Sequence, residues 1–375
     1  MKVLFTGGGS GGHFYPIIAI AQELNKIAEE KHLIDFKLYF MSDDPYSDRV
    51  LFENGITFIK IKTGKMRKYF SFLNFIDFFK TIIASTQALV RVFMLYPDVV
   101  VGKGGYASFP ALFAARLLRI PVVIHESDSV PGRVNKWAAK FAKKIAISYP
   151  EAAEHLPKEK IALTGNPIRN DVLNPTKEGA HELLKLERSV PVIFILGGSL
   201  GAKIVNEAIL QAVPDIIEKY QIIHQVGRKN LKEMKDLAEV ILEDREHKER
   251  YKMFGYLDNQ AMKMSAGVAD LVISRAGSTI FEIAAWGVPS IIVPITDTNG
   301  DHQRKNAYSY ARAGAADVIE EKNLTPHLLV SEINRLMDDS QKREKMSNAA
   351  KEFSKSDAAR KIAEQVMNVL VEHQK

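Results

Sequence analysis

Two copies of one short pattern, an apolar run that ends in a turn of glycine and serine, constrain the fold of this chain more than any other feature. The first copy is VLFTGGGSGG at residues 3–12, and the second is VIFILGGSLG at residues 192–201. Short apolar runs bounded by glycine turns are typical of buried strands in parallel sheets. Because the pattern recurs after about 190 residues, we expect two similar α/β halves.

Composition limits the class of protein and its compartment. With 375 residues, of which 46% are hydrophobic, the chain can bury the cores of two domains. It has no cysteine, which excludes disulfides, thiolate zinc sites and cysteine nucleophiles. The N-terminal apolar run is too short for a signal peptide, and no run approaches the roughly 18 apolar residues of a membrane span. We therefore expect a cytosolic or peripheral membrane protein.

The net charge of +6, with a pI of about 9.1, favours an anionic partner. No aromatic run typical of RNA-binding modules is present, so we expect no nucleic acid. Basic and aromatic residues gather instead from about Lys60 to Phe79, which favours an amphipathic helix at an anionic membrane surface, although part of the set must be core. The basic members are Lys60, Lys62, Lys65, Arg67 and Lys68, and the apolar members are Tyr69, Phe70, Phe72, Leu73, Phe75, Ile76, Phe78 and Phe79.

The stretch from Arg275 to Asn306 predicts a site for a nucleotide diphosphate. Its pattern is a small-residue turn, a helix, a buried strand at residues 290–293, a polar loop and a second helix. The turn at residues 276–278 leaves backbone N–H groups free at the start of the helix, where they favour phosphate. One turn further into the helix, Glu282 is suited to accept hydrogen bonds from ribose hydroxyls.

The first glycine loop also allows a different interpretation. Gly7, Gly9 and Gly12 fit the G-x-G-x-x-G pattern of dinucleotide-binding proteins. The acidic residue that such proteins place at the end of the second strand comes late here, at Asp43 or Asp44. An NAD-dependent oxidoreductase therefore stays open as an alternative, although it leaves the second half of the chain unexplained.

The order of several motifs resembles the MurG family of GT-B glycosyltransferases, which add N-acetylglucosamine to the lipid-linked muramyl-peptide precursor of peptidoglycan. These motifs are the first glycine loop, GKGGYAS at residues 102–108, HESD at 125–128, TGNPIR at 164–169 and the stretch at 275–306. The resemblance implies an α/β fold of two Rossmann-like parallel-sheet domains that face each other across a cleft. Its expected parts are an N-terminal acceptor and membrane-associating domain at 1–165, a C-terminal UDP-GlcNAc-binding domain at 166–345, and a C-terminal helix at 346–375 that packs back on the first domain.

The resemblance also implies an activity. The expected reaction is the inverting transfer of N-acetylglucosamine from UDP-GlcNAc to the 4-hydroxyl of MurNAc in undecaprenyl-diphospho-MurNAc-peptide. The protein is expected to be peripheral, on the cytoplasmic side of the inner or plasma membrane. Other cell-wall proteins are expected as partners there. No metal or cofactor is expected, since the chain has no D-x-D pair to hold a cation. His13 is the favoured general base, because imidazole suits this role near neutral pH, and Glu126 is the alternative. The helix after His13 should begin near Pro16, since proline favours the first helical turn.

Substrate-binding residues follow from the same resemblance. Arg169 would meet the donor diphosphate as a planar, permanently charged fork, and the backbone of Leu257 would pair with uracil. The acceptor diphosphate would face the loop at residues 102–108, where Lys103 adds a cation. The donor-binding residues are Ser10, Gly11, Gly12, Asp128, Arg169, Ser199, Leu257, Gly277, Ser278, Thr279, Glu282 and Gln303, and the acceptor-binding residues are Gly104, Gly105 and Tyr106.

Two departures from the family pattern concern the donor sugar. Ser127 and Asp128 stand where the family usually has Gln-Asn, and His302 stands for the first Gln of Q-Q-x-x-N. An aspartate accepts a hydrogen bond from a hydroxyl but cannot donate one as an amide does. Two further alternatives stay open: a GT-B transferase that acts on a membrane lipid such as diacylglycerol, and a non-catalytic protein that binds phospholipid through its basic aromatic stretch.

Overall fold

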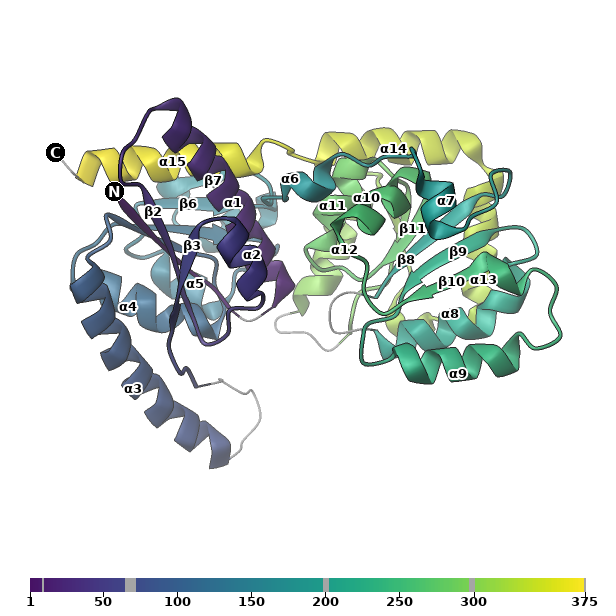
Figure 1. Ribbon diagram of the computed structural model, residues 1–375, viewed down its shortest axis with the longest axis horizontal. Helices are drawn as coiled ribbons and strands as arrows, with labels where there is room; N and C mark the ends of the chain where they lie inside the picture. Colours follow the sequence, from purple (N-terminus) through teal and green to yellow (C-terminus); the bar gives the residue numbers. More distant parts are fainter. Residues whose placement is uncertain (9, 65–71, 198–201, 297–300, 374–375) are drawn as a thin grey trace. The chain divides into compact units, whose positions relative to one another are not determined.

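The computed structural model describes residues 1–8, 10–64, 72–197, 202–296 and 301–373 of the chain (Figure 1). The chain divides into two compact units. The first combines residues 1–169 with 356–375, and the second is residues 170–355. Each unit contains one sheet whose strands all pair in parallel, so the predicted class of two parallel-sheet α/β domains is confirmed.

Within the described residues, seven strands form the sheet of the first unit: β1 (Lys2–Thr6), β2 (Lys37–Ser42), β3 (Ile56–Lys60), β4 (Val99–Gly102), β5 (Val122–Glu126), β6 (Lys144–Ile147) and β7 (Ile161–Leu163). They lie in the order β3-β2-β1-β4-β5-β6-β7. The central strands β1, β4 and β5 are almost wholly buried because helices cover both faces of the sheet, as is usual for parallel sheets.

The helices of the first unit are α1 (Gly11–Glu30), α2 (Asp48–Glu53), α3 (Phe72–Leu95), α4 (Phe109–Leu117), α5 (Arg133–Ala138) and α15 (Ala358–His373). Side chains alternate along each strand, so Val3 and Phe5 pack with α1 and α15, whereas Leu4 packs with α3 and α4. The C-terminal helix α15 lies beside α1 (Figure 1), and its buried Leu370 belongs to the same core as Phe5.

Six strands form the sheet of the second unit: β8 (Val192–Leu196), β9 (Gln221–Gln225), β10 (Tyr251–Phe254), β11 (Ala269–Ser274), β12 (Ser290–Ile292) and β13 (Ala316–Val318). Their order is β10-β9-β8-β11-β12-β13. Alternation again separates two cores, since Ile193 and Ile195 of β8 belong to one and Phe194 to the other.

Helices α6 (Asn170–Leu173), α7 (Ala180–Leu184), α8 (Lys203–Ile216), α9 (Leu231–Ile241), α10 (Asn259–Val268), α11 (Thr279–Trp286), α12 (His302–Arg312), α13 (Pro326–Asp338) and α14 (Ser340–Phe353) complete the second unit. Residues of α8 and α13 such as Ile209 and Leu329 belong to the core of Ile193, and residues of α11 and α12 such as Ile280 and Tyr310 belong to the core of Phe194. Residues 346–353, which we expected in the C-terminal helix, form the end of α14 in the second unit, and α15 follows as a separate helix in the first.

Both sheets reverse their strand order at one place, between β1 and β4 in the first unit and between β8 and β11 in the second. Open α/β sheets bind ligands at such a point, outside the carboxyl ends of the strands. In the first unit the loops there begin at Gly7 and Lys103, and in the second they begin at Gly197 and Arg275. The fold therefore brings the predicted glycine loops to the ligand-binding edge of each sheet.

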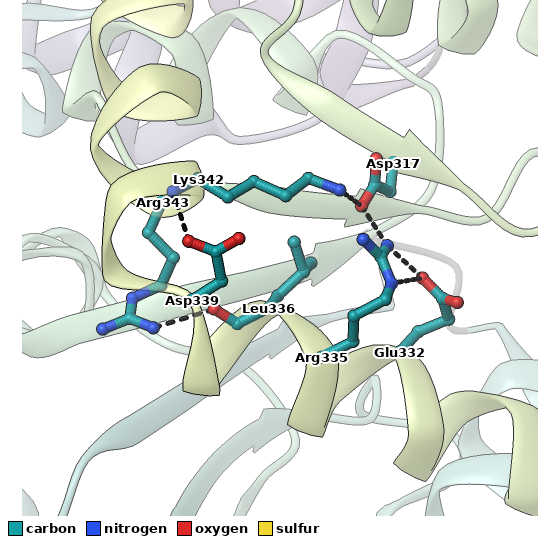
Figure 2. A network of polar contacts seen from close by, with 7 residues as sticks. All are labelled: Asp317, Glu332, Arg335, Leu336, Asp339, Lys342 and Arg343. Atoms are coloured by element: carbon teal, nitrogen blue, oxygen red, sulfur yellow. Dashed lines mark hydrogen bonds and ion pairs between the residues drawn. The ribbon is translucent and has the colours of Figure 1, made fainter.

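A network of charged side chains links the edge strand β13 to helices α13 and α14 (Figure 2). Asp317 of β13 accepts hydrogen bonds from Arg335 of α13 at 2.6 Å and from Lys342 of α14 at 2.9 Å. Arg335 also pairs with Glu332, and Asp339 caps α14 by accepting from the backbone N–H of Lys342 at 2.8 Å. Because these groups are partly exposed, each pair stabilises the fold by only about 0–1 kcal/mol.

Helix α1 begins at Gly11, so the prediction that it begins near Pro16 is wrong. Pro16 lies inside the helix, where its missing N–H leaves the carbonyl of Gly12 without its usual intrahelical donor. The glycines of the first turn concealed the true start, because glycine disfavours helix in any sequence-based estimate. His13 consequently lies in the first turn of α1, next to the glycine loop.

Replacing Leu370 by alanine should destabilise the first unit by about 2–5 kcal/mol, because it leaves a cavity between α15 and α1. The matched control is Val371→Ala, whose side chain is 39% exposed and whose loss should change stability by no more than about 0.5 kcal/mol. Urea unfolding followed by Trp137 fluorescence, with Trp286 replaced by phenylalanine in every variant, measures the first unit alone. Equal losses for the two substitutions would show that α15 contributes nothing to this core.

Candidate functional site

Two glycine loops meet at the switch point of the first sheet. The loop after β1 joins the loop after β4 through a hydrogen bond of 3.1 Å that Gly8 N donates to Gly104 O. Gly104 and Gly105 have φ of 89° and 82°, a region that residues with a side chain rarely adopt. A Cβ on Gly105 would also lie 3.0 Å from the Cα of Gly8. Glycine at these positions is therefore what lets the two backbones approach.

Ser10 and His13, two residues predicted for the site, contact each other beside this crossing. Ser10 is the N-cap of α1, and its Oγ lies 3.0 Å from Nδ1 of His13. The imidazole lies against the second loop, since a Cβ built on Gly105 would be 3.6 Å from its Cε1. Gly11 and Gly12 complete the first turn of the helix between them. The candidate base thus lies next to the predicted acceptor loop.

The second loop offers hydrogen-bond donors to a ligand. Within the described residues, the N–H groups of Gly104 and Gly105 donate to no acceptor. The phenol of Tyr106 donates a hydrogen bond of 2.7 Å to Asp43 Oδ2, and burial together with that carboxylate raises the pKa of Tyr106. The loop therefore presents amides suited to an anion, and Asp43 fixes the ring beside them.

Glu126 organises the loop that follows β5. Its Oε1 accepts a hydrogen bond of 3.0 Å from Asp128 N, and its Oε2 accepts from Gly132 N at 3.0 Å and from Asn135 Nδ2 at 2.9 Å. Glu126 is only 4% exposed, and burial, followed by the charge of Asp128, raises the pKa of its carboxyl group. A Cβ on Gly104 would lie 2.9 Å from the same Asn135 Nδ2, so the loop after β4, the loop after β5 and helix α5 meet here.

Lys103 and His125 are buried beneath these loops. Burial lowers the pKa of Lys103 to about 8, although Glu126 and Asp128 oppose the change. Burial also lowers the pKa of His125 far below its usual value, and the charge of Lys103 acts in the same direction. The neutral imidazole lies 3.1 Å from Gly165 O and 3.2 Å from Ser148 Oγ through Nε2, so it is a structural group of the interior.

Arg169, predicted for the donor diphosphate, is buried at the end of the first unit. Its guanidinium carbon lies 3.7 Å from the centre of the Tyr15 ring, which belongs to α1 two residues after His13. Tyr15 in turn packs edge-on against Tyr46, with ring centres 5.5 Å apart. This cation–π contact fixes the plane of the guanidinium on the same helix that carries His13.

The second unit presents the start of α11 at its own switch point. Ser278 is the N-cap, and within the described residues the N–H groups of Gly277, Ser278 and Thr279 donate to no acceptor. Glu282 is half-buried on the first turn. Asn306 of α12 donates a hydrogen bond of 3.3 Å to Ala276 O and so supports the turn from behind.

Side chains also fix the loop after β12. Gln303 Oε1 accepts a hydrogen bond of 3.2 Å from Ile295 N, so this predicted donor residue supports the loop in this structure. Arg275 donates to Val293 O at 3.2 Å and forms an ion pair with Glu321, with both side chains largely buried. Two side chains therefore hold the described start of this loop, at residues 293–295.

The predicted uracil-binding position has a partner in the structure. Leu257 N donates a hydrogen bond of 2.9 Å to the side-chain Oε1 of Gln225, which lies at the end of β9. A uracil base that pairs with the N–H of Leu257 must displace the side chain of Gln225. Ser199, the other donor residue predicted nearby, lies outside the described residues.

Sequence reasoning missed Asp43, Asn135 and Tyr15 as members of the site. Each acts on a predicted residue rather than standing in a motif: Asp43 on Tyr106, Asn135 on Glu126 and Tyr15 on Arg169. Asn135 and Tyr15 are the two that a local signal could have revealed, since each lies within ten residues of a motif at the carboxyl end of a predicted strand.

Alanine at Gly104 should destabilise the first unit by about 1–2 kcal/mol or more, because its φ is positive and its Cβ would meet Asn135. Gly132→Ala is the matched control. Gly132 has φ of −64° and open space around a Cβ, and alanine keeps the N–H that Glu126 accepts. Urea unfolding midpoints of the two variants provide the test, and a Gly104→Ala variant as stable as Gly132→Ala would contradict the account of the crossing loops.

Two family models match the chain, one in its N-terminal half and one in its C-terminal half. The glycosyltransferase family 28 N-terminal domain matches residues 3–147, and the glycosyltransferase family 28 C-terminal domain matches residues 192–365. A Bacillus cereus protein named UDP-N-acetylglucosamine--N-acetylmuramyl-(pentapeptide) pyrophosphoryl-undecaprenol N-acetylglucosamine transferase 2 is 38% identical over 368 residues. That alignment covers 97% of this chain and 99% of the relative.

Solved structures show the same architecture. Acinetobacter baumannii MurG is similar with a TM-score of 0.73 and 26% identity, covering 98% of this chain and 99% of that one. UDP-GlcNAc 2-epimerase from Neisseria meningitidis shares the fold with a TM-score of 0.68 and 16% identity, covering 98% of this chain and 100% of that one. Because proteins with different names share this fold, the family models and the sequence identity decide the family. The chain belongs to glycosyltransferase family 28 and has the GT-B fold.

Proposed function

We propose that this chain transfers N-acetylglucosamine from UDP-GlcNAc to the 4-hydroxyl of MurNAc in undecaprenyl-diphospho-MurNAc-peptide, with inversion at the anomeric carbon. The product is lipid II, the precursor for peptidoglycan and cell-wall synthesis. The observation that carries the proposal is the 38% identity, over 97% of the chain, to a relative named for this transfer. We assign the acceptor and the membrane to the first unit, and most contacts with the donor nucleotide to the second.

The second unit supplies the groups that the UDP part of the donor requires. Amides at residues 277–279 suit the pyrophosphate, and Glu282 suits the ribose hydroxyls, since it lies one turn inside the same helix. The backbone of Leu257 pairs with uracil once Gln225 releases its N–H. Ser199 adds a hydroxyl donor from the second glycine loop.

Arg169 stabilises the leaving UDP in this proposal. Breaking the anomeric bond leaves negative charge on the diphosphate, and fixed donors aimed at that charge lower the barrier. The Tyr15 ring already holds the guanidinium in one plane, 3.7 Å away, so little order is lost when phosphate oxygens bind. This arrangement performs the task without a metal ion.

His13 is the general base that we propose. When its Nδ1 donates to Ser10 Oγ, the imidazole has its lone pair on Nε2, where it can take the proton of the acceptor hydroxyl. Glu126 is the less suited candidate, because both its oxygens already accept hydrogen bonds from Asp128, Gly132 and Asn135. The attacking oxygen then displaces UDP from the opposite face of the sugar.

One face of α3 is apolar and exposed, which supports contact with a membrane surface. Phe79, Ile83, Val90, Phe93 and Met94 are 49–78% exposed, while the opposite face packs against α4. None of the helices in the described ranges is both long and apolar enough to span a bilayer. We propose that this face lies among the headgroups of an anionic inner leaflet, as a peripheral contact.

The basic part of the predicted membrane stretch completes this proposal. Lys60 and Lys62 are exposed at the end of β3, ahead of the helix. Lys65, Arg67, Lys68, Tyr69 and Phe70 lie outside the described residues. The exposed apolar face continues beyond Phe79, the expected end of the contact, as far as Met94.

Alanine at His13 should lower kcat by about 10²–10⁴-fold, because the acceptor hydroxyl loses its base. The affinity for UDP-GlcNAc, measured by calorimetry, should change by less than about twofold. Turnover is measured as UDP released from UDP-GlcNAc with a short-chain lipid-linked muramyl-peptide diphosphate, in detergent and with EDTA. His155→Ala, which removes an exposed histidine of the same unit, is the control. Near-normal turnover of His13→Ala would exclude His13 as the general base and leave Glu126 as the candidate. Turnover of the wild type with diacylglycerol as the sole acceptor would contradict the assignment of the muramyl-peptide acceptor.

Replacing Phe93 and Met94 together by serine should weaken binding to vesicles of anionic phospholipid by about tenfold or more, since two apolar side chains no longer enter the interface. Turnover with a short-chain, water-soluble acceptor should be unchanged. Phe52→Ser, which removes an 86% exposed phenylalanine from α2 of the same unit, is the matched control. Co-sedimentation at two salt concentrations measures the effect, and equal binding by both variants would exclude α3 as the contact.

A further inference from the structure

Lys103 is a buried cation without a hydrogen-bond partner. Its residue is 2% exposed, and within the described residues Nζ contacts no acceptor. The backbone holds it firmly, because Lys103 N donates to Thr6 O at 2.9 Å and a Cβ on Gly7 would lie 3.4 Å from its own Cβ. A buried ammonium group that lacks partners destabilises a fold, so its presence at a ligand-binding edge calls for a functional reason.

The charges that face this ammonium come from the strand and loop next to it. Glu126, at the end of β5, and Asp128, two residues later, are the carboxylates that interact with it. The other titratable groups are the neutral His125 of β5, which feels the charge of Lys103, and His13 of α1, which interacts with His125. The ammonium group of Lys103 therefore interacts with both carboxylates.

Without the charge of Lys103, the carboxylates of Glu126 and Asp128 would only repel each other. Glu126 is already bound by three N–H donors and must stay ionised to accept all of them well. The charge of Asp128 favours a proton on Glu126, whereas the charge of Lys103 disfavours it. If Glu126 took up a proton, it would lose acceptor capacity toward the loop of residues 126–132 that carries Asp128.

We propose that Lys103 is a positioning residue whose buried charge keeps Glu126 ionised beside Asp128, so that Asp128 is presented as a carboxylate to a hydroxyl of a bound sugar. This rests on the proposed function for the identity of the substrate. Lys103 is the second residue of the GKGGYAS loop at residues 102–108, and Asp128 stands where the family usually has Asn. The positive charge of Lys103 thus accompanies the negative charge of Asp128, at a position where the family usually has the uncharged amide of Asn.

The test is a double-mutant cycle of Lys103→Met and Asp128→Asn in the full chain. Alone, K103M should raise KM for a sugar substrate by roughly tenfold, the effect of weakening one hydrogen bond to a charged acceptor. In the D128N background the same K103M change should cost less than about twofold, since no second carboxylate then needs compensation. Separate KM values for UDP-GlcNAc and for the lipid-linked acceptor show which sugar Asp128 contacts. Equal costs of K103M in both backgrounds would overturn the proposal.

The pH profile separates this role from a merely structural one. Loss of the ammonium raises the pKa of Glu126, so the acid limb of kcat/KM should move to higher pH in K103M and return in the double variant. The control K136M removes an exposed lysine from neighbouring α5 and should leave the limb in place. An acid limb of K103M that coincides with the wild-type limb would contradict the proposal.

Stability provides a readout that does not depend on the substrate. The folded pKa of Lys103, about 8, lies below its usual 10.5, so the unfolded chain holds this proton more tightly. The wild type should therefore gain stability as pH rises from about 8 to 10.5, whereas K103M should lack this gain and be at least as stable at pH 7. If the wild type shows no transfer, the proposed function fails. The coupling between positions 103 and 128 can still be measured, from the urea midpoints of the wild type, K103M, D128N and the double variant between pH 4 and 7. Additive midpoints would then overturn the inference alone.

Discussion

The hydrogen bond between the backbones of Gly8 and Gly104 is the contact on which the candidate site depends. It exists because the strand order reverses between β1 and β4, which places the two loops side by side, and because neither loop carries a side chain where they cross. The imidazole of His13 lies against Gly105 for the same reason. Any bulk at this crossing would separate the candidate base from the amides that suit an acceptor anion.

Charge is arranged around this crossing by burial more than by surface pairs. Glu126 accepts three hydrogen bonds in the interior, and Lys103 lies near it without a direct bond. The guanidinium of Arg169 lies over the Tyr15 ring, a cation–π contact that fixes its plane. Such groups stabilise little by themselves, and their arrangement is understandable if a charged substrate completes it.

Local signals in the sequence were sufficient for the strands and glycine loops. The runs that became β1 and β8 are apolar and end in glycine, and these features act within a few residues. The start of α1 was misjudged because propensity gave Pro16 more weight than the cap at Ser10. Local rules weigh single residues, and the contact of this loop with Gly104 lies outside their reach.

Contacts between distant residues could not be predicted in the same way. Tyr106 and Asp43 are 63 positions apart, and Leu257 and Gln225 are 32 apart. Both pairs meet only because parallel strands bring their carboxyl ends to one edge, and the strand order that decides this is a property of the whole sheet. The second pair matters for function, since Gln225 accepts the hydrogen bond of the Leu257 N–H, the group assigned to pair with uracil.

The most direct test follows the labelled sugar of UDP-GlcNAc in the presence of EDTA, with and without a short-chain lipid-linked muramyl-peptide diphosphate. The account predicts labelled lipid-linked disaccharide with a β linkage, formed together with an equal amount of UDP, and only when the acceptor is present. Conversion of the sugar nucleotide to its 2-epimer without acceptor, or binding of UDP-GlcNAc with no labelled lipid, would contradict the assignment of this family 28 chain as the transferase.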